Sequence, residues 1–195
     1  MYRLMLVSVA ILGATAFAEL QSCAEEKKSE PDNLLINGSF KDGPEEIGEF
    51  KPLDKESTEI KGWKVSRAQI DYIGTYWKAA DGKRSIDLHG SPGFGGISQT
   101  FKTKKEQKYR VTFYLAGNPD GSVPKKKLGV KAADKEAAFE FDVTGKSRDE
   151  MGWEKKTWDF VATDSETTLE IFSLMTEDEA CGPALDAVSV VAIKE

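Results

Sequence analysis

Two groups of polar and aromatic side chains in this sequence have the types and spacing needed to hold a hydroxyl-rich ligand. Asp87 and His89 alternate with apolar neighbours, so both should point to the outward face of one strand. Arg110 and Tyr114 should share the outward face of a second strand in the same way. Charged groups bind hydroxyls by hydrogen bonds, and an aromatic ring packs against the C–H face of a sugar. We therefore predict a ligand site made of these four residues and two aromatics on a nearby loop, Tyr76 and Trp77.

Plainer interpretations compete for each of these residues. A loop aromatic such as Trp77 more often folds onto the domain than faces a ligand. Tyr114 is the stronger candidate because it is expected to point outward from a strand. Gln99 is interpreted as a core amide with satisfied hydrogen bonds rather than as a ligand contact. Three other aromatics fall in strand patterns and are predicted to be core: Trp63, Phe101 and Trp158.

No arrangement typical of catalysis stands out. His89 is the single histidine of the chain, and no Gly-x-Ser-x-Gly sequence is present. A glycoside hydrolase needs two carboxylates facing each other across a bond, and pairs such as Asp42 with Glu45 read as ordinary loop acids. The sequence therefore predicts a protein that is not an enzyme.

Strands, rather than helices, should position these residues. After residue 62 the chain alternates apolar and polar residues with a period of two between turn-forming segments, which is typical of an all-β antiparallel sandwich. The segment 135–138 is expected in a hairpin rather than a helix, and 41–61 is expected to be a long loop. The inward-facing residues are predicted to be Ile86, Leu88, Val111, Phe113, Leu115, Leu128, Val130, Ala132, Phe139, Phe141, Val143, Trp158, Phe160, Ala162, Leu169, Ile171, Leu185 and Ala187.

The first 22 residues have the layout of an export signal. Arg3 precedes an uncharged apolar run over 4–18, which is too short to span a membrane stably. Residues 16–18, Ala-Phe-Ala, suit an ordinary signal peptidase. Residues 20–23, Leu-Gln-Ser-Cys, resemble a bacterial lipobox, in which the cysteine is lipidated. The sequence fits both cleavage after Ala18 and cleavage before Cys23.

The residues after this signal favour the lipid anchor. Residues 23–32 are charged and lack the apolar content needed to pack, so they should form an extended tether between Cys23 and a domain over 33–193. A disulfide between Cys23 and Cys181 is the alternative for an exported protein. A cysteine on a flexible tether makes a poor structural cross-link, so lipidation of Cys23 is the preferred prediction.

Composition limits the partners. Removing residues 1–22 leaves 173 residues, and the net charge stays at −6 because one Arg and one Glu are lost. An acidic chain of this kind argues against a nucleic-acid partner. No second long apolar run follows the signal, so membrane contact is predicted only through the lipid anchor.

A series of short segments lies in a fixed order along the chain. They are Asn33-Leu-Leu-Ile-Asn-Gly-Ser-Phe40, Gly62-Trp63, Asp71-Tyr-Ile73, Asp81-Gly-Lys-Arg-Ser-Ile-Asp-Leu-His-Gly-Ser91, Gly95-Gly-Ile-Ser-Gln-Thr-Phe101, Tyr109-Arg-Val-Thr-Phe-Tyr-Leu-Ala-Gly-Asn-Pro119, Cys181-Gly-Pro183 and Leu185-Asp-Ala-Val-Ser189. This series resembles the family called domain of unknown function 642, whose bacterial members are often labelled choice-of-anchor C proteins. The resemblance implies a galactose-binding-like jelly roll, as in carbohydrate-binding modules, and an extracytoplasmic protein. Plant members are linked to cell walls, to wall polysaccharides and to pectin-modifying enzymes.

The same resemblance raises the question of a structural calcium ion. Related carbohydrate-binding jelly rolls often hold calcium between an opening Asn-Gly-x-Phe-Glu segment and a carboxylate of the last strand. Asp186 matches the last-strand position, but Lys41 stands where the opening segment would carry Glu. Asp42 is the possible substitute. We expect no cofactor, with calcium at Asp186 and Asp42 as the less favoured alternative.

Together these observations predict a non-catalytic module of the cell envelope that binds a polysaccharide or glycan. The alternative from another class is a protein-interaction or adhesion module, for example a partner of a wall-modifying enzyme. The protein is expected to be exported and lipid-anchored, or periplasmic or secreted if the anchor is absent.

Overall fold

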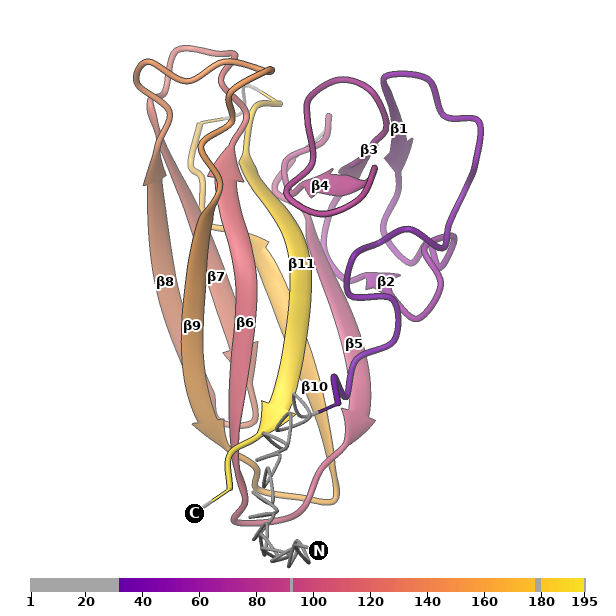
Figure 1. The fold of residues 1–195 in the computed structure, drawn as a ribbon, viewed down its shortest axis with the longest axis vertical. Coiled ribbons are helices and arrows are strands. Elements are labelled where there is room, and N and C mark those ends of the chain that lie inside the picture. Colours follow the sequence, from indigo (N-terminus) through magenta and orange to yellow (C-terminus); the bar gives the residue numbers. More distant parts are fainter. Residues whose placement is uncertain (1–31, 92, 178–179, 195) are drawn as a thin grey trace, which may run out of the picture. The chain divides into compact units, whose positions relative to one another are not determined.

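Two antiparallel β-sheets form the computed structural model, which describes residues 32–91, 93–177 and 180–194 (Figure 1). Within these ranges the chain contains no helix, so none of the described elements is a membrane-spanning helix. The predicted all-β antiparallel sandwich is confirmed. Its strands are β1 (Phe50–Leu53), β2 (Lys64–Val65), β3 (Ile70–Ile73), β4 (Ser85–Asp87), β5 (Gly96–Lys102), β6 (Lys108–Gly117), β7 (Lys125–Ala132), β8 (Lys135–Asp142), β9 (Glu154–Val161), β10 (Glu166–Ser173) and β11 (Pro183–Ala192).

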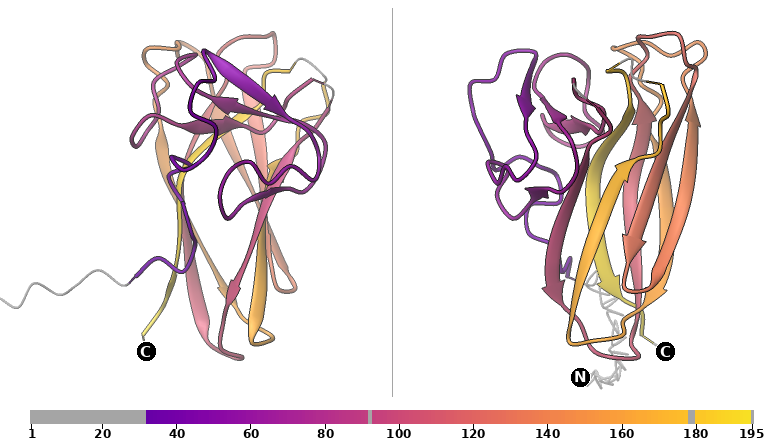
Figure 2. Two further views of the ribbon diagram at one scale, coloured as in Figure 1. Left: turned by 90° about the vertical axis from the view of Figure 1, so that its right-hand side faces the viewer. Right: turned by 180° about the vertical axis from the view of Figure 1, so that it is seen from behind.

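The strands divide between a six-stranded sheet in the order β1-β3-β4-β11-β6-β9 and a five-stranded sheet in the order β2-β5-β10-β7-β8. In Figure 1 strands β9, β6 and β11 lie in front of β7 and β10, and the right panel of Figure 2 shows the same two layers from behind. The alternating apolar residues fill the space between the layers, as the period-two pattern predicts. Val111, Phe113 and Leu115 of β6 are fully buried there, as are Leu169 and Ile171 of β10.

The segment 135–138 lies in a hairpin, as expected. Strands β7 and β8 pair from Lys125 opposite Asp142 to Ala132 opposite Lys135, which leaves two residues for the turn. Ala133 has a φ of +49° in that turn, the left-handed conformation that two-residue hairpins demand.

The expectation of a continuous loop over 41–61 is wrong, because β1 lies within it. Pro52 hid this strand, since proline has no N–H for a sheet and usually argues against strand structure. β1 is the edge strand of its sheet and pairs only with β3, with Pro52 opposite Asp71. A proline is tolerated at such an edge because one side of the strand needs no hydrogen bond.

The alternation expected along the last strand is also wrong beyond Leu185. The pairing of β11 with β6 slips between Asp186 and Ser189, where two residues oppose Phe113 alone. Ala187 adopts a φ of +47° at this β-bulge. The extra residue turns Val188 and Val190 into the core and leaves Ala187 partly exposed.

The opening segment of the domain closes one side of the sandwich. Asn33 binds β11 through its side chain, accepting from the Val190 N–H and donating to the Val188 carbonyl. Gln99 lies in the core and both accepts from and donates to the backbone of Ile36, at 2.6 and 2.9 Å. The prediction that Gln99 is a satisfied core amide is therefore confirmed.

Candidate functional site

The outward face of β4 is covered, not open to solvent as expected. Ser85 and Asp87 do point away from the sandwich core, because Ile86 between them points into it. Asp87 is nevertheless only 1 % exposed, and His89 just beyond the strand is fully buried. The loop over 74–83 lies on this face, since Trp77 donates from its indole Nε1 to the Ser85 hydroxyl at 2.8 Å.

Trp77 is therefore a core residue, and its expected role as an exposed stacking ring does not fit its position. Its side chain is 4 % exposed, and its indole Nε1 already donates to the Ser85 hydroxyl. Tyr76 is different, because its ring is partly exposed and stands edge-on to Phe50 with ring centroids 5.5 Å apart. The loop thus turns one aromatic ring inward and leaves its neighbour beside a pocket.

A clamp of charged groups fixes the orientation of Tyr76. Its hydroxyl donates to Asp120 Oδ2 at 2.5 Å and accepts from Arg148 Nη2 at 2.6 Å. The Arg148 guanidinium also donates to Asp120 and stacks over the Tyr76 ring at 3.8 Å from the centroid. Burial and the bond to Asp120 raise the pKa of Tyr76 to about 12, so its hydroxyl stays protonated at neutral pH.

The ring of Tyr76 lines a pocket of about 240 Å³ on the outer face of the six-stranded sheet. Strands β1, β3 and β4 supply its floor, and the chain around residues 118 and 180–181 supplies one end. Apolar and polar groups meet in it, as they do in small-molecule sites generally. The described lining residues are Phe50, Pro52, Gln69, Asp71, Ile73, Tyr76, Asp87, Ser91, Asn118, Ala180 and Cys181.

Two carboxyl groups lie side by side on the floor of this pocket. Asp71 of β3 pairs directly with Asp87 of β4 in the antiparallel register. Asp87 is held by three hydrogen bonds, from the Asn118 amide at 2.9 Å and from the N–H groups of His89 and Gly182 at 3.0 Å each. Asp71 is 9 % exposed, and its Oδ1 has no hydrogen-bond partner among the described residues.

The environment of these two acids favours their protonated forms. Burial raises the pKa of Asp71 to about 6. Burial also raises the pKa of Asp87 to about 7, opposed by the Asn118 hydrogen bond and assisted by the negative charge of Asp71. A pocket floor with such a pair can accept hydrogen bonds from ligand hydroxyls and disfavours further negative charge.

The six residues predicted for the ligand site do not form one site. Only Tyr76 and Asp87 line the same pocket. Arg110 is exposed on β6 and pairs with Asp159 of β9 at 2.8 Å. Tyr114 lines a separate hollow of about 250 Å³ together with Trp153, whose indole donates to the Lys78 carbonyl.

Three important pocket residues were missed from the sequence: Phe50, Asp71 and Asn118. Phe50 lies in the strand that Pro52 concealed. Asp71 could have been found, because a strand of alternating residues places it on the outward face beside Asp87. Asn118 follows β6 at a turn, and nothing in its sequence position indicates that it reaches β4.

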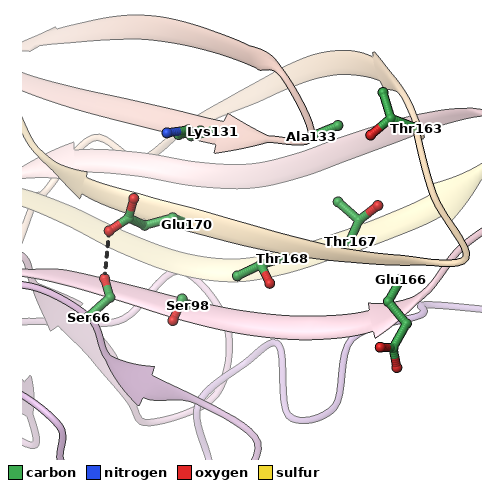
Figure 3. Close-up of a pocket in the computed structure, with 9 residues that line it drawn as sticks. All are labelled: Ser66, Ser98, Lys131, Ala133, Thr163, Glu166, Thr167, Thr168 and Glu170. Atoms are coloured by element: carbon green, nitrogen blue, oxygen red, sulfur yellow. Dashed lines mark hydrogen bonds between the residues drawn. The ribbon is translucent and has the colours of Figure 1, made fainter.

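A larger hollow, of about 420 Å³, lies on the outer face of the five-stranded sheet (Figure 3). Figure 3 shows its hydroxyl and charged side chains spread along the sheet, with Ser66 donating to Glu170 at 2.8 Å. None of its described lining residues is aromatic, so it offers no ring on which a sugar could stack. The lining residues are Ser66, Ser98, Lys131, Ala133, Thr163, Glu166, Thr167, Thr168 and Glu170.

The residues considered for calcium are engaged otherwise. Asp186 is fully buried at the β-bulge, and its two oxygens accept hydrogen bonds from the N–H groups of Asp81 and Ala187. Burial raises its pKa to about 7. Asp42 is exposed, with its backbone bonded to the Asn37 side chain, and it lines a hollow that does not include Asp186. Among the described residues no group of three His, Cys, Asp or Glu is arranged to hold a metal ion, so this donor set does not fit a calcium site.

Comparison with known proteins identifies the family. The sequence pattern of the family described as "Protein of unknown function (DUF642)" matches residues 33–191. The chain belongs to the DUF642 family. The resemblance noted in the sequence is thus confirmed over nearly the whole domain.

Relatives of this DUF642 domain include much longer proteins. Halomucin of Haloquadratum walsbyi is 32 % identical over 166 residues, covering 82 % of this chain and 2 % of halomucin. The Arabidopsis thaliana protein DUF642 L-galactono-1,4-lactone-responsive gene 2 is 28 % identical, covering 91 % of this chain and 46 % of the plant protein. The chain therefore spans less than half the length of the curated relatives it matches.

Solved structures share the fold at low identity. The carbohydrate-binding module TmCBM61, solved in complex with beta-1,4-galactotriose, superposes with a TM-score of 0.51 and 16 % identity over 83 % of this chain and 99 % of that chain. A structure titled "Family 16 Carbohydrate Binding Module-2" gives a TM-score of 0.50 and 15 % identity over 82 % and 99 % of the two chains. The jelly-roll sandwich of this DUF642 domain is thus the fold used by such modules.

Proposed function

We propose that this DUF642 domain is a carbohydrate-binding module whose site is the pocket between Phe50, Tyr76 and the Asp71–Asp87 pair. One observation carries the proposal: an oriented aromatic ring and an incompletely hydrogen-bonded carboxyl group line the same small pocket. Arg148 covers one face of the Tyr76 ring, so the exposed ring of Phe50 beside it offers the face for sugar C–H groups. The Asp71 carboxyl group offers an acceptor for hydroxyls. The shared fold with carbohydrate-binding modules supports the same function.

The proposed function is binding without catalysis. A glycosidase needs one carboxyl group as a proton donor and a second that reaches the anomeric carbon or a water. Asp87 is 1 % exposed and held by three hydrogen bonds, which keep it in the pocket floor. It supports the pocket but does not reach a glycosidic bond.

The test is a binding panel of soluble polysaccharides, including galactan, arabinan, xylan and a β-glucan, measured by affinity electrophoresis and calorimetry. Loss of a stacking ring at about 1 kcal/mol corresponds to a roughly fivefold loss of affinity. We expect Phe50→Ala to weaken binding by at least that factor, because Phe50 is 40 % exposed and packs on Tyr76.

Val161→Ala is the matched control, since Val161 is a similarly exposed apolar residue of β9 and does not line the pocket. It should bind as the wild type does. The proposal is wrong if the wild-type protein binds no member of the panel, or if Phe50→Ala binds as tightly as Val161→Ala.

For location, we propose export and attachment to the cell envelope through a lipid on Cys23, which lies outside the described residues. The support is the signal-like sequence over 1–22 and the charged tether after it. Cys23→Ser should move the protein from the membrane fraction to the soluble fraction, whereas Cys181→Ser should leave it in the membrane fraction. A soluble wild-type protein with a mature N-terminus at Glu19 would exclude the lipid anchor.

A further inference from the structure

We infer that the pocket selects an uncharged sugar unit over the corresponding uronic acid, and that Asp71 is the residue that sets this selectivity. This inference rests on the proposed carbohydrate-binding function and adds the class of sugar. It follows from the charges around the pocket, from its size and from the different hydrogen bonding of its two acids.

The charged side chains that line the pocket are all acidic among the described residues. Its described lining residues include Asp71 and Asp87 and contain neither lysine nor arginine. Two cations lie next to lining residues, and both have partners: Arg148 binds Asp120, and Lys126 donates to the Cys181 carbonyl at 2.7 Å. A carboxylate brought into the pocket would therefore meet negative charge without a cation to pair with it.

An uncharged sugar meets no such charge repulsion in the pocket. Its hydroxyls are donors as well as acceptors, and a carboxylate that lacks a partner gains a hydrogen bond from such a donor. The rings of Phe50 and Tyr76 provide the apolar wall that the C–H face of a pyranose requires. The volume of about 240 Å³ lies below the roughly 300–1,000 Å³ typical of drug-sized ligands, so the pocket suits a single sugar ring.

Asp71, rather than Asp87, is the acid that faces the ligand. Asp87 is 1 % exposed and its three hydrogen bonds use both of its oxygens. Asp71 is 9 % exposed and lines the pocket, and no hydrogen bond to its carboxyl group is found among the described residues. Its Oδ1 is shielded from solvent, so the ligand contact falls to the other carboxyl oxygen. Replacing Asp71 by Asn keeps the shape of the side chain and removes its charge, which makes this substitution the direct test.

The experiment uses the purified full chain and two matched pairs of probes: methyl galactoside with methyl galacturonoside, and methyl glucoside with methyl glucuronoside. Affinities are measured by NMR titration at pH 7.5. We expect at least one uncharged probe to bind at least tenfold more tightly than its uronic acid partner. In Asp71→Asn this ratio should fall to threefold or less, whereas Asp134→Asn, in the exposed turn between β7 and β8, should keep the wild-type ratio.

A pH series on the wild-type protein gives a second measurement that needs no substitution. The titratable groups that line the pocket with Asp71 are Asp87 on β4, Tyr76 on the 74–83 loop and Cys181 before β11, while β1 contributes only Phe50 and Pro52. At pH 5 both aspartates are mostly protonated, whereas a uronic acid with a pKa of about 3.5 stays ionised. The ratio of the affinity for the uncharged probe to the affinity for its uronic acid partner should therefore be smaller at pH 5 than at pH 7.5.

Each outcome has a distinct meaning. Uronic acids that bind as tightly as their uncharged partners would overturn this inference and leave the proposed function intact. A preference that persists in Asp71→Asn and at pH 5 would overturn the role of Asp71. If no probe binds and no polysaccharide of the panel binds, the proposed function fails as well; if polysaccharides bind but no single sugar unit does, the inference alone fails.

Discussion

At the scale of single residues, the buried acids make stability depend on pH in an unusual direction. Burial raises the pKa of Asp71 from 3.8 to about 6, so the folded protein binds a proton here that the unfolded chain has already released. The contribution of Asp71 to the free energy of unfolding is therefore fully present below about pH 4 and is lost as the pH rises through about 6. Asp87 and Asp186, each with a pKa raised to about 7, act in the same direction.

Asp71→Asn should therefore become more stable relative to the wild type as the pH rises from 4 to 7.5. The shift of about two pKa units corresponds to a change of at most about 3 kcal/mol in the free energy of unfolding. Urea denaturation of both proteins at the two pH values measures it. An equal difference between the two proteins at both pH values would show that Asp71 is not perturbed in the folded state.

Trp77 gives a second prediction at this scale. Because its ring is 4 % exposed and its Nε1 donates to Ser85, Trp77→Ala should destabilise the domain by about 3–5 kcal/mol. Phe50→Ala removes an exposed ring and should lower the melting temperature far less. If calorimetry shows similar small losses for both, the 74–83 loop does not cover β4 in solution.

At the scale of elements, the opening segment depends on close contact with the β-bulge of β11. Gly38 accepts from the Val188 N–H at 2.8 Å, and a Cβ at position 38 would lie 1.9 Å from the Val188 carbonyl oxygen. That overlap is with backbone, which yields less readily than a flexible side chain. Close packing at the bulge therefore explains why glycine stands at position 38.

We expect Gly38→Ala to cost about 3 kcal/mol in the free energy of unfolding, at the upper end of overpacking effects. The control is Gly48→Ala, where the added Cβ meets open space and only the φ of +62° adds strain, about 1 kcal/mol. Equal costs for the two variants in denaturant titrations would contradict the proposed packing.

At the scale of the whole molecule, an apolar core and hydrogen bonds to the backbone hold the two sheets and their loops together. The carboxyl group of Asp186 joins the 74–83 loop to β11 by accepting the Asp81 N–H at 2.8 Å. Its other oxygen accepts the Ala187 N–H, so both oxygens of this buried carboxyl group are engaged by the backbone. Lys41, which lines the neighbouring hollow, adds positive charge there.

A chelator should therefore shift the melting temperature by less than about 2 °C, equivalent to under ~1 kcal/mol for a domain of this size. Calcium at a concentration 100 times its dissociation constant would stabilise the domain by about 2.7 kcal/mol. Its removal would then lower the melting temperature by roughly 5 °C or more. A drop of that size in differential scanning calorimetry would show that Asp186 and backbone carbonyls do bind calcium.

The sequence by itself determined the fold class and most of the core. Alternation with a period of two is a local property, because successive side chains of a strand point to opposite faces. It correctly assigned the inward residues of β6, β7 and β10, such as Val111, Leu128 and Ile171. It failed where one residue changed the local rule, at Pro52 in β1 and at the bulge after Asp186.

The ligand pocket was decided only by the tertiary structure. Alternation separates inward from outward residues, but it does not say whether another segment covers the outward face. The 74–83 loop buries Trp77 against Ser85, and Asn118 arrives from the end of β6 to bind Asp87. The pairing of β3 with β4 then places Asp71 beside Asp87. Each of these contacts joins segments that only folding brings together, so the arrangement of the six-stranded sheet and its loops creates the pocket.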